Sequence, residues 1–241
     1  MKFYFNFYGQ VPKDQTAPDY IEDYLKIGKD IAIISDGASE SYDSRTFARL
    51  VCKHYKKRRK INQAWIKKIT SEFASTVDVN TLSWSKEAAY RRGSFASLLT
   101  VYNSSVPNHI NLFAIGDSIA VLVDGNKIQE SYPYTQPKQF QSRPELLGSN
   151  PEHNRFVQDK KFKKVHSTHW DLSYISDPII LCMTDALGEW VLRNNETNDN
   201  IWEELLTVDN EEDFHKLVLD QWQTRQMRKD DITLIRILCS L

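Results

Sequence analysis

Aromatic and polar residues alternate at the start of the chain. Three phenylalanines within residues 1–8 fall on one face of an extended segment, which predicts a strand that ends at Gly9. Residues 30–36 (DIAIISD) form an apolar run that stops at an Asp-Gly pair, as a buried strand does when it meets a turn. We therefore expect Asp36 at the end of a strand.

The hydrophobic period changes to 3.6 in the next part of the chain. Residues 44–60 and a segment that begins at Asn62 each place apolar side chains on one side, so two helices are expected, the first with Ser44 as its N-cap. The strand pattern then returns in three closely spaced segments: 94–102, 110–115 and 119–123. The last of these leads through an Asp-Gly-Asn turn into a further extended segment, which indicates an antiparallel meander.

The segment 131–177 is rich in proline and has little periodicity, so we expect a long irregular flap between strands and no second domain. Residues 178–185 (PIILCMTD) then form an apolar run that ends at Asp185. Helical segments follow at 186–192, 201–206 and 211–226, and the chain closes on a strand over 231–239. This order of elements predicts one α+β domain over residues 1–241.

Composition narrows the class of protein. The chain carries 31 basic and 32 acidic residues, and this balance argues against a nucleic-acid binder, which needs concentrated positive charge. The basic run 53–60 is interpreted as the solvated face of a helix. Three cysteines lie far apart in the sequence, which favours a reducing compartment, and no apolar stretch approaches the roughly 18 residues that span a bilayer. We expect a cytoplasmic protein without a membrane segment.

Acidic residues recur where predicted strands begin or end. Asp36 and Asp185 close two apolar runs, Asp230 precedes the last strand, and Asp117 lies in a Gly-Asp-Ser turn. Any one of them could be an ordinary turn residue. Carboxylates that converge repel one another and need a compensating cation, and oxygen ligands without histidine or cysteine favour Mg²⁺ or Mn²⁺.

Five motifs in one order make the acidic pattern more specific: IISDGAS, GSFASLLTVY, INLFAIGDS, ILCMTDALGEW and RKDDITLIRI. Together they resemble the VxDG, GSTA, GDS, TDGLWD and DNIT motifs of the type 2C metal-dependent Ser/Thr protein phosphatases, over nearly the whole chain. The resemblance implies a four-layer αββα sandwich of two antiparallel sheets flanked by helices. It also implies hydrolysis of phosphoserine or phosphothreonine in a phosphorylated protein by a metal-bridging hydroxide, with a cognate Ser/Thr kinase as a further partner.

The resemblance assigns residues to two Mn²⁺ or Mg²⁺ ions. Asp36 is expected to bridge both ions, and the backbone carbonyl of Gly37 to complete the coordination of one. Asp185 and Asp230 are expected to hold the other ion. Asp36, Asp185 and Asp230 would therefore act in catalysis through metal-bound water.

Two further sets of ligands follow from the same resemblance. Asp117 and Glu189 correspond to residues that hold a weaker third ion in many family members. A carboxylate from the N-terminal loop is also expected. Asp14 is chosen for it by its spacing from the first strand-end aspartate, with Asp19 and Asp23 as alternatives.

The chain departs from the family pattern at the phosphate-binding position. The family has an N-terminal arginine for the substrate phosphate, but here no arginine precedes Arg45, so Lys13 or Arg45 could supply the charge. Ala38 replaces a histidine of eukaryotic members, Ala186 the TDG glycine, and Asp231 the DNIT asparagine. Three interpretations stay open: a protein phosphatase, a catalytically weak or inactive regulatory module that binds a kinase or sensor, and a hydrolase of small phosphoesters.

Overall fold

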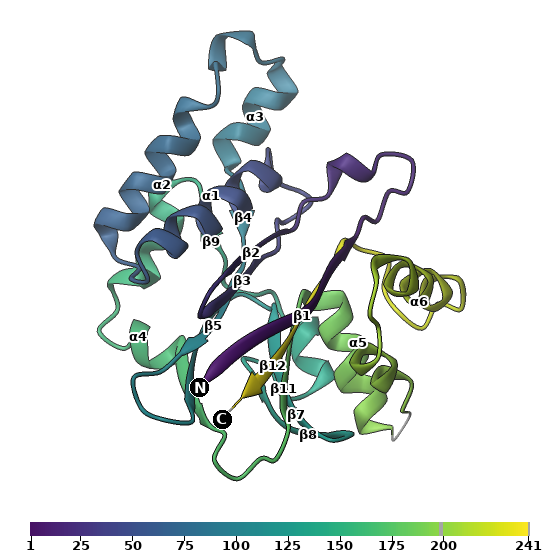
Figure 1. The fold of residues 1–241 in the computed structure, drawn as a ribbon. Helices are drawn as coiled ribbons and strands as arrows, with labels where there is room; N and C mark the ends of the chain where they lie inside the picture. Colours follow the sequence, from purple (N-terminus) through teal and green to yellow (C-terminus); the bar gives the residue numbers. More distant parts are fainter. Residues whose placement is uncertain (198–199, 241) are drawn as a thin grey trace.

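A computed structural model describes residues 1–197 and 200–240 of the chain. Two five-stranded antiparallel sheets lie face to face, with helices on their outer faces (Figure 1). The first sheet has the order β1 (Lys2–Val11), β12 (Ile232–Ser240), β11 (Pro178–Met183), β7 (Ile119–Asp124) and β8 (Lys127–Tyr132). The second has the order β10 (Ser167–Asp171), β6 (His109–Ile115), β5 (Leu98–Asn103), β3 (Ile31–Ser35) and β2 (Tyr24–Gly28). A short ladder joins β4 (Phe95–Ala96) to β9 (Leu147–Gly148).

Helices cover both sheets. The second sheet packs against α1 (Ser44–Lys57) and α2 (Gln63–Ser75), and α3 (Trp84–Arg92) stands beyond them. The first sheet packs against α5 (Asp185–Glu196) and α6 (Glu211–Gln223). Short helices complete the fold: η1 (Pro18–Tyr20), η2 (Val79–Thr81), η3 (Pro137–Gln141), η4 (Pro151–Gln158), α4 (Phe162–Val165) and η5 (Asn200–Leu206).

Strand β3 illustrates how the central strands are buried on both faces. All five of its residues are buried, and its side chains alternate between two apolar layers. Ile31 and Ile33 pack with the helices of the second sheet, whereas Ala32 and Ile34 pack between the sheets with residues of β7, β11 and β12. A third apolar layer lies between the first sheet and α5 and α6. The expected four-layer αββα sandwich is confirmed.

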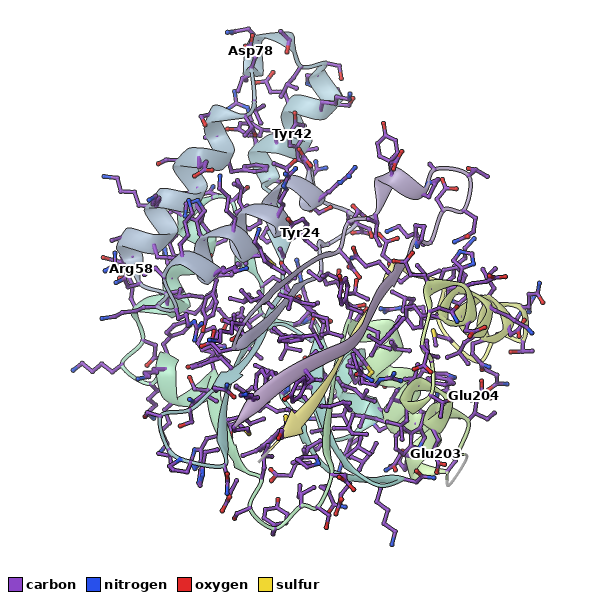
Figure 2. The ribbon with its side chains drawn as sticks, in the orientation of Figure 1. Tyr24, Tyr42, Arg58, Asp78, Glu203 and Glu204 are labelled. Carbon is purple, nitrogen blue, oxygen red and sulfur yellow. The ribbon has the colours of Figure 1, made fainter. Side chains whose placement is uncertain are left out.

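The N-cap of the first helix lies one residue earlier than predicted. The N-cap of α1 is Asp43, whose carboxylate accepts the backbone N–H of Thr46, so the prediction of Ser44 is wrong. The basic run at the end of this helix is exposed from Lys57 to Lys60, as expected for a solvated face. Figure 2 shows Arg58 at the outer surface, beyond the helix end.

The segment 131–177 is more ordered than an irregular flap. It contains η3, β9, η4 and α4, and β10 pairs with β6 as an edge strand of the second sheet. Helix α3 was also not predicted, because none of its residues is buried and no apolar stripe marks it. The helix predicted at 201–206 is the 3-10 helix η5. Among the described residues, no helix has the length and apolar character that a membrane crossing requires.

Candidate metal centre

Three aspartates from different elements converge at one end of the two sheets. Asp36 directly follows β3, Asp117 lies in the turn between β6 and β7, and Asp185 opens α5 after β11. One carboxylate oxygen from each lies within 4.8 Å of the other two. All three residues are partly buried. Such a set of hard oxygen donors suits Mg²⁺ or Mn²⁺.

The position of Asp36 is fixed through its backbone. Its N–H donates to Ser97 Oγ at 2.9 Å, and its carbonyl accepts the Ser97 N–H at 2.8 Å. Ser97 Oγ also bonds Ser118 Oγ at 2.8 Å, which links the Asp-Gly turn to the Gly-Asp-Ser turn. A Cβ at Gly37 would lie 2.8 Å from the backbone oxygen of Glu22. Only glycine therefore fits after Asp36.

Asp185 is placed by the pairing of β11 with β12. Thr184 donates its N–H to the carbonyl of Thr233 at 3.2 Å and accepts the Thr233 N–H on Oγ1 at 3.0 Å. These two bonds extend the ladder to the residue before Asp185. Because Asp230 lies just before β12, the same pairing brings it beside Asp185. Burial, and then the charge of Asp185, raise the pKa of the Asp230 carboxyl.

Two basic side chains contact the acidic group, which here means Asp36, Asp117 and Asp185 together with the neighbouring Asp230. Arg228 Nη2 forms an ion pair with Asp185 and lies 3.5 Å from Asp230 Oδ2. Lys13 Nζ lies 3.6 Å from Asp230 Oδ1 and 2.5 Å from Glu22 Oε2. Asp230 is thus flanked by a cation on each side.

Burial and mutual repulsion disfavour ionisation of these carboxyls. Burial, followed by the charges of Asp23 and Asp185, raises the pKa of Asp36 well above its ordinary value. Burial and then the charge of Asp185 raise the pKa of Asp117 to about 7. A cluster that resists ionisation in this way needs added positive charge to become fully charged at neutral pH.

Several solved structures with a similar architecture are phosphatases. The Mycobacterium tuberculosis serine/threonine phosphatase PstP/Ppp has a TM-score of 0.61 at 15% identity, covering 98% of each chain. Stp1 from Staphylococcus aureus has a TM-score of 0.60 at 15% identity, covering 98% of this chain and 94% of its own. The catalytic domain of PstP with two manganese ions has a TM-score of 0.59 at 16% identity, covering 99% of each. This chain has the type 2C phosphatase fold. No family model and no curated protein matches its sequence.

The residues of this phosphatase fold fit a divalent metal. Besides the converging carboxylates, the buried Asp23 has one oxygen, Oδ1, without a hydrogen-bond partner in the described part of the chain. Its other oxygen accepts from Thr233 Oγ1 at 2.7 Å. Burial and then the nearby charges of Asp231, Asp185 and Asp230 raise the pKa of Asp23 well above its ordinary value. An unpaired buried carboxylate oxygen at an acidic cluster is a natural cation ligand.

The structure separates the three N-terminal candidates. Asp14 lies exposed in its loop, where it accepts the N–H and Oγ1 of Thr16, and it does not join the acidic group. Asp19 is exposed on η1. Only Asp23 is buried beside the strand-end aspartates, at 2% exposure. Spacing along the N-terminal loop could not distinguish Asp23 from Asp14, because strand β2, which begins after Asp23, has no regular pattern of buried positions.

Two further residues singled out from the sequence lie close to Asp185 and Asp230. Glu189 is one helical turn beyond Asp185 and pairs with Arg193 at 3.0 Å. Asp231 accepts the backbone N–H groups of Lys13 and Glu22, each at 2.7 Å, so it fastens the N-terminal loop.

The two candidates for the missing positive charge differ in position. Arg45 is exposed on α1, whereas Lys13 contacts the acidic group. Arg228 was not singled out by the sequence pattern. It stands in the motif RKDDITLIRI, only two residues before Asp230, and that proximity was the available signal.

Proposed function

We propose that the chain is a Mn²⁺- or Mg²⁺-dependent protein serine/threonine phosphatase. The observation that carries this proposal is the convergence of Asp36, Asp117 and Asp185 at one end of a type 2C fold. Asp36 would bind both of two ions, with the Gly37 carbonyl beside it, and Asp185 and Asp230 would bind the second. Divalent ions bound here would activate water and polarise the phosphoryl group.

Residues of the chain would hold these ions in place. Asp23 would take the place first given to Asp14 as the N-terminal carboxylate, because its Oδ1 is buried and unpaired among the described residues. Asp117 and Glu189 would serve a weaker third ion. Hydrogen bonds between the Asp36 backbone and Ser97 keep Asp36 in place without occupying its carboxylate.

The proposed substrate is phosphoserine or phosphothreonine in a protein, and a cognate Ser/Thr kinase would be the enzyme that produces it. A cavity of about 420 Å³ lies between η3 and α5, and Asp185 lines it. The three cysteines are free and buried, which fits the proposed reducing, cytoplasmic compartment.

One observation favours the regulatory module as a second candidate. Lys13 and Arg228 form ion pairs with Asp230 and Asp185, and such pairing could stabilise a fold that binds partners without turnover. A module of this kind would bind Mn²⁺ weakly and would not release phosphate.

Parallel assays separate these functions. Hydrolysis of a phosphothreonine peptide and of para-nitrophenyl phosphate is measured with Mn²⁺ and with chelator. Mn²⁺-dependent turnover of the peptide supports the protein phosphatase. Turnover of the small ester alone favours a hydrolase of small phosphoesters, and no turnover of either favours the module.

A further inference from the structure

Arg228 is an arginine at the acidic group that belongs to the C-terminal part of the chain. It lies in the loop between α6 and β12, four residues before Ile232, where that strand starts. Its Nη2 contacts both Asp185 and Asp230, the two residues proposed to share one ion. The guanidinium therefore lies at the edge of the proposed metal centre.

The same side chain is open to solvent on its other side. Its exposed fraction is 55%, compared with 14% for Asp185. Its Nε and Nη1 make no hydrogen bond in the described part of the chain, so several N–H groups remain free to donate to a second anion. Arg228 also lines the cavity between η3 and α5, so it lies where that cavity meets the acidic group.

We infer that Arg228 binds the phosphoryl group of the substrate, in place of an arginine in the N-terminal segment. This inference rests on the proposed function for the identity of the substrate. A guanidinium donates several hydrogen bonds in one plane and matches phosphate oxygens, and it keeps its charge at every physiological pH.

Lys13 is less suited to the same role. Its ammonium is held by Glu22 Oε2 and Ser39 Oγ, each at 2.5 Å, and it also faces Asp230. The ammonium is thus committed to Glu22 of the N-terminal loop, to Ser39 in the segment between β3 and α1, and to Asp230. Lys13 fastens this loop, whereas Arg228 has donors to spare.

Charge also favours a basic residue at this position. Asp23, Asp36, Asp117, Asp185 and Asp230 could carry five negative charges, and two divalent cations would supply four positive ones. A phosphoryl dianion would still meet a site without excess positive charge. The Arg228 guanidinium, which lines the cavity, would offset that repulsion.

The test is binding of inorganic phosphate to the Mn²⁺-loaded protein by titration calorimetry. Arg228→Ala is expected to weaken phosphate binding by about 10- to 100-fold, the loss typical of charge-assisted hydrogen bonds, and Arg228→Lys to restore part of it. Lys229→Ala is the matched control, because it removes one positive charge at the next residue, where Nζ lies 5.9 Å from the Trp222 ring centroid. The control should bind phosphate as the wild type does.

A second readout is Mn²⁺ affinity in the absence of phosphate. Arg228→Ala should bind Mn²⁺ at least as tightly as the wild type, because the guanidinium no longer competes for Asp185 and Asp230. Loss of Mn²⁺ binding in both Arg228 variants would overturn the inference, since Arg228 would then support the acidic group structurally. Phosphate binding that is equal in Arg228→Ala and wild type would also overturn it.

Failure of the proposed function gives a different result. A wild type that binds Mn²⁺ and phosphate through Arg228 but releases no phosphate from a peptide would refute the phosphatase and leave the Arg228 site supported. A Mn²⁺-loaded wild type that binds no phosphate would overturn the Arg228 site itself.

Discussion

Removing divalent metal should reverse the pH dependence of the chain's stability. Without metal, burial and the charge of Asp185 raise the pKa of Asp117 from 3.8 to about 7. The folded chain then holds a proton that the unfolded chain releases, so the free energy of unfolding falls as pH rises between about 4 and 7. Above that window Asp117 is ionised in both states, and the stabilisation from its proton is lost.

The size of the effect follows from the shift. About three pKa units correspond to about 4 kcal/mol at most, at about 1.4 kcal/mol per unit. For a chain of this length, 1 kcal/mol moves Tm by about 2–4 °C. Asp117→Asn removes the charge, so in chelator above about pH 7 this variant should melt up to about 16 °C above the wild type.

The assay is thermal unfolding in chelator from about pH 5 to pH 8, for the wild type and Asp117→Asn. The wild type should lose stability as pH rises, and the variant should lose less. With saturating Mn²⁺ the wild-type slope should change sign, because metal ligands must be deprotonated. Equal slopes for the two proteins in chelator, or a wild type without metal that gains stability with rising pH, would refute the reasoning.

Two further predictions concern how the acidic group is built. Gly37→Ala places a Cβ 2.8 Å from the Glu22 backbone oxygen, so it should lower the free energy of unfolding in urea by about 1–3 kcal/mol; wild-type stability would contradict the close packing. Asp23→Asn should weaken Mn²⁺ binding about 10-fold or more in calorimetry, whereas Asp14→Asn, the exposed control, should bind as the wild type does. The opposite ranking of these two variants would restore Asp14 as the ligand.

The strand-end aspartates could be predicted because each follows or precedes an apolar run. Such runs mark buried strands, and Asp36 and Asp185 follow β3 and β11, which belong to the two facing sheets and end at the same side. The resemblance to the family motifs then implied the order of the four layers, which the structure confirms. These features depend on local pattern.

Other features depend on contacts that no local pattern reports. Strand β2 has only partly buried positions, so Asp23, which precedes it, had no signal to separate it from Asp14. Helix α3 buries none of its residues, and the edge strand β10 mixes polar and apolar positions. The contact between Arg228 and Asp185 joins residues 43 positions apart and follows only from the pairing of β11 with β12.

The most direct test of the account is release of phosphate from a phosphothreonine peptide by the wild type and by Asp36→Asn. Asp36 is the aspartate proposed to contact both ions. Its backbone is held by hydrogen bonds with Ser97, so a change of its carboxylate leaves these bonds in place. We predict Mn²⁺-dependent release by the wild type, its abolition by chelator, and loss of at least about 100-fold in Asp36→Asn, in line with removal of a key electrostatic contact. Turnover by Asp36→Asn at the wild-type rate, or wild-type turnover that persists in chelator, would contradict the account.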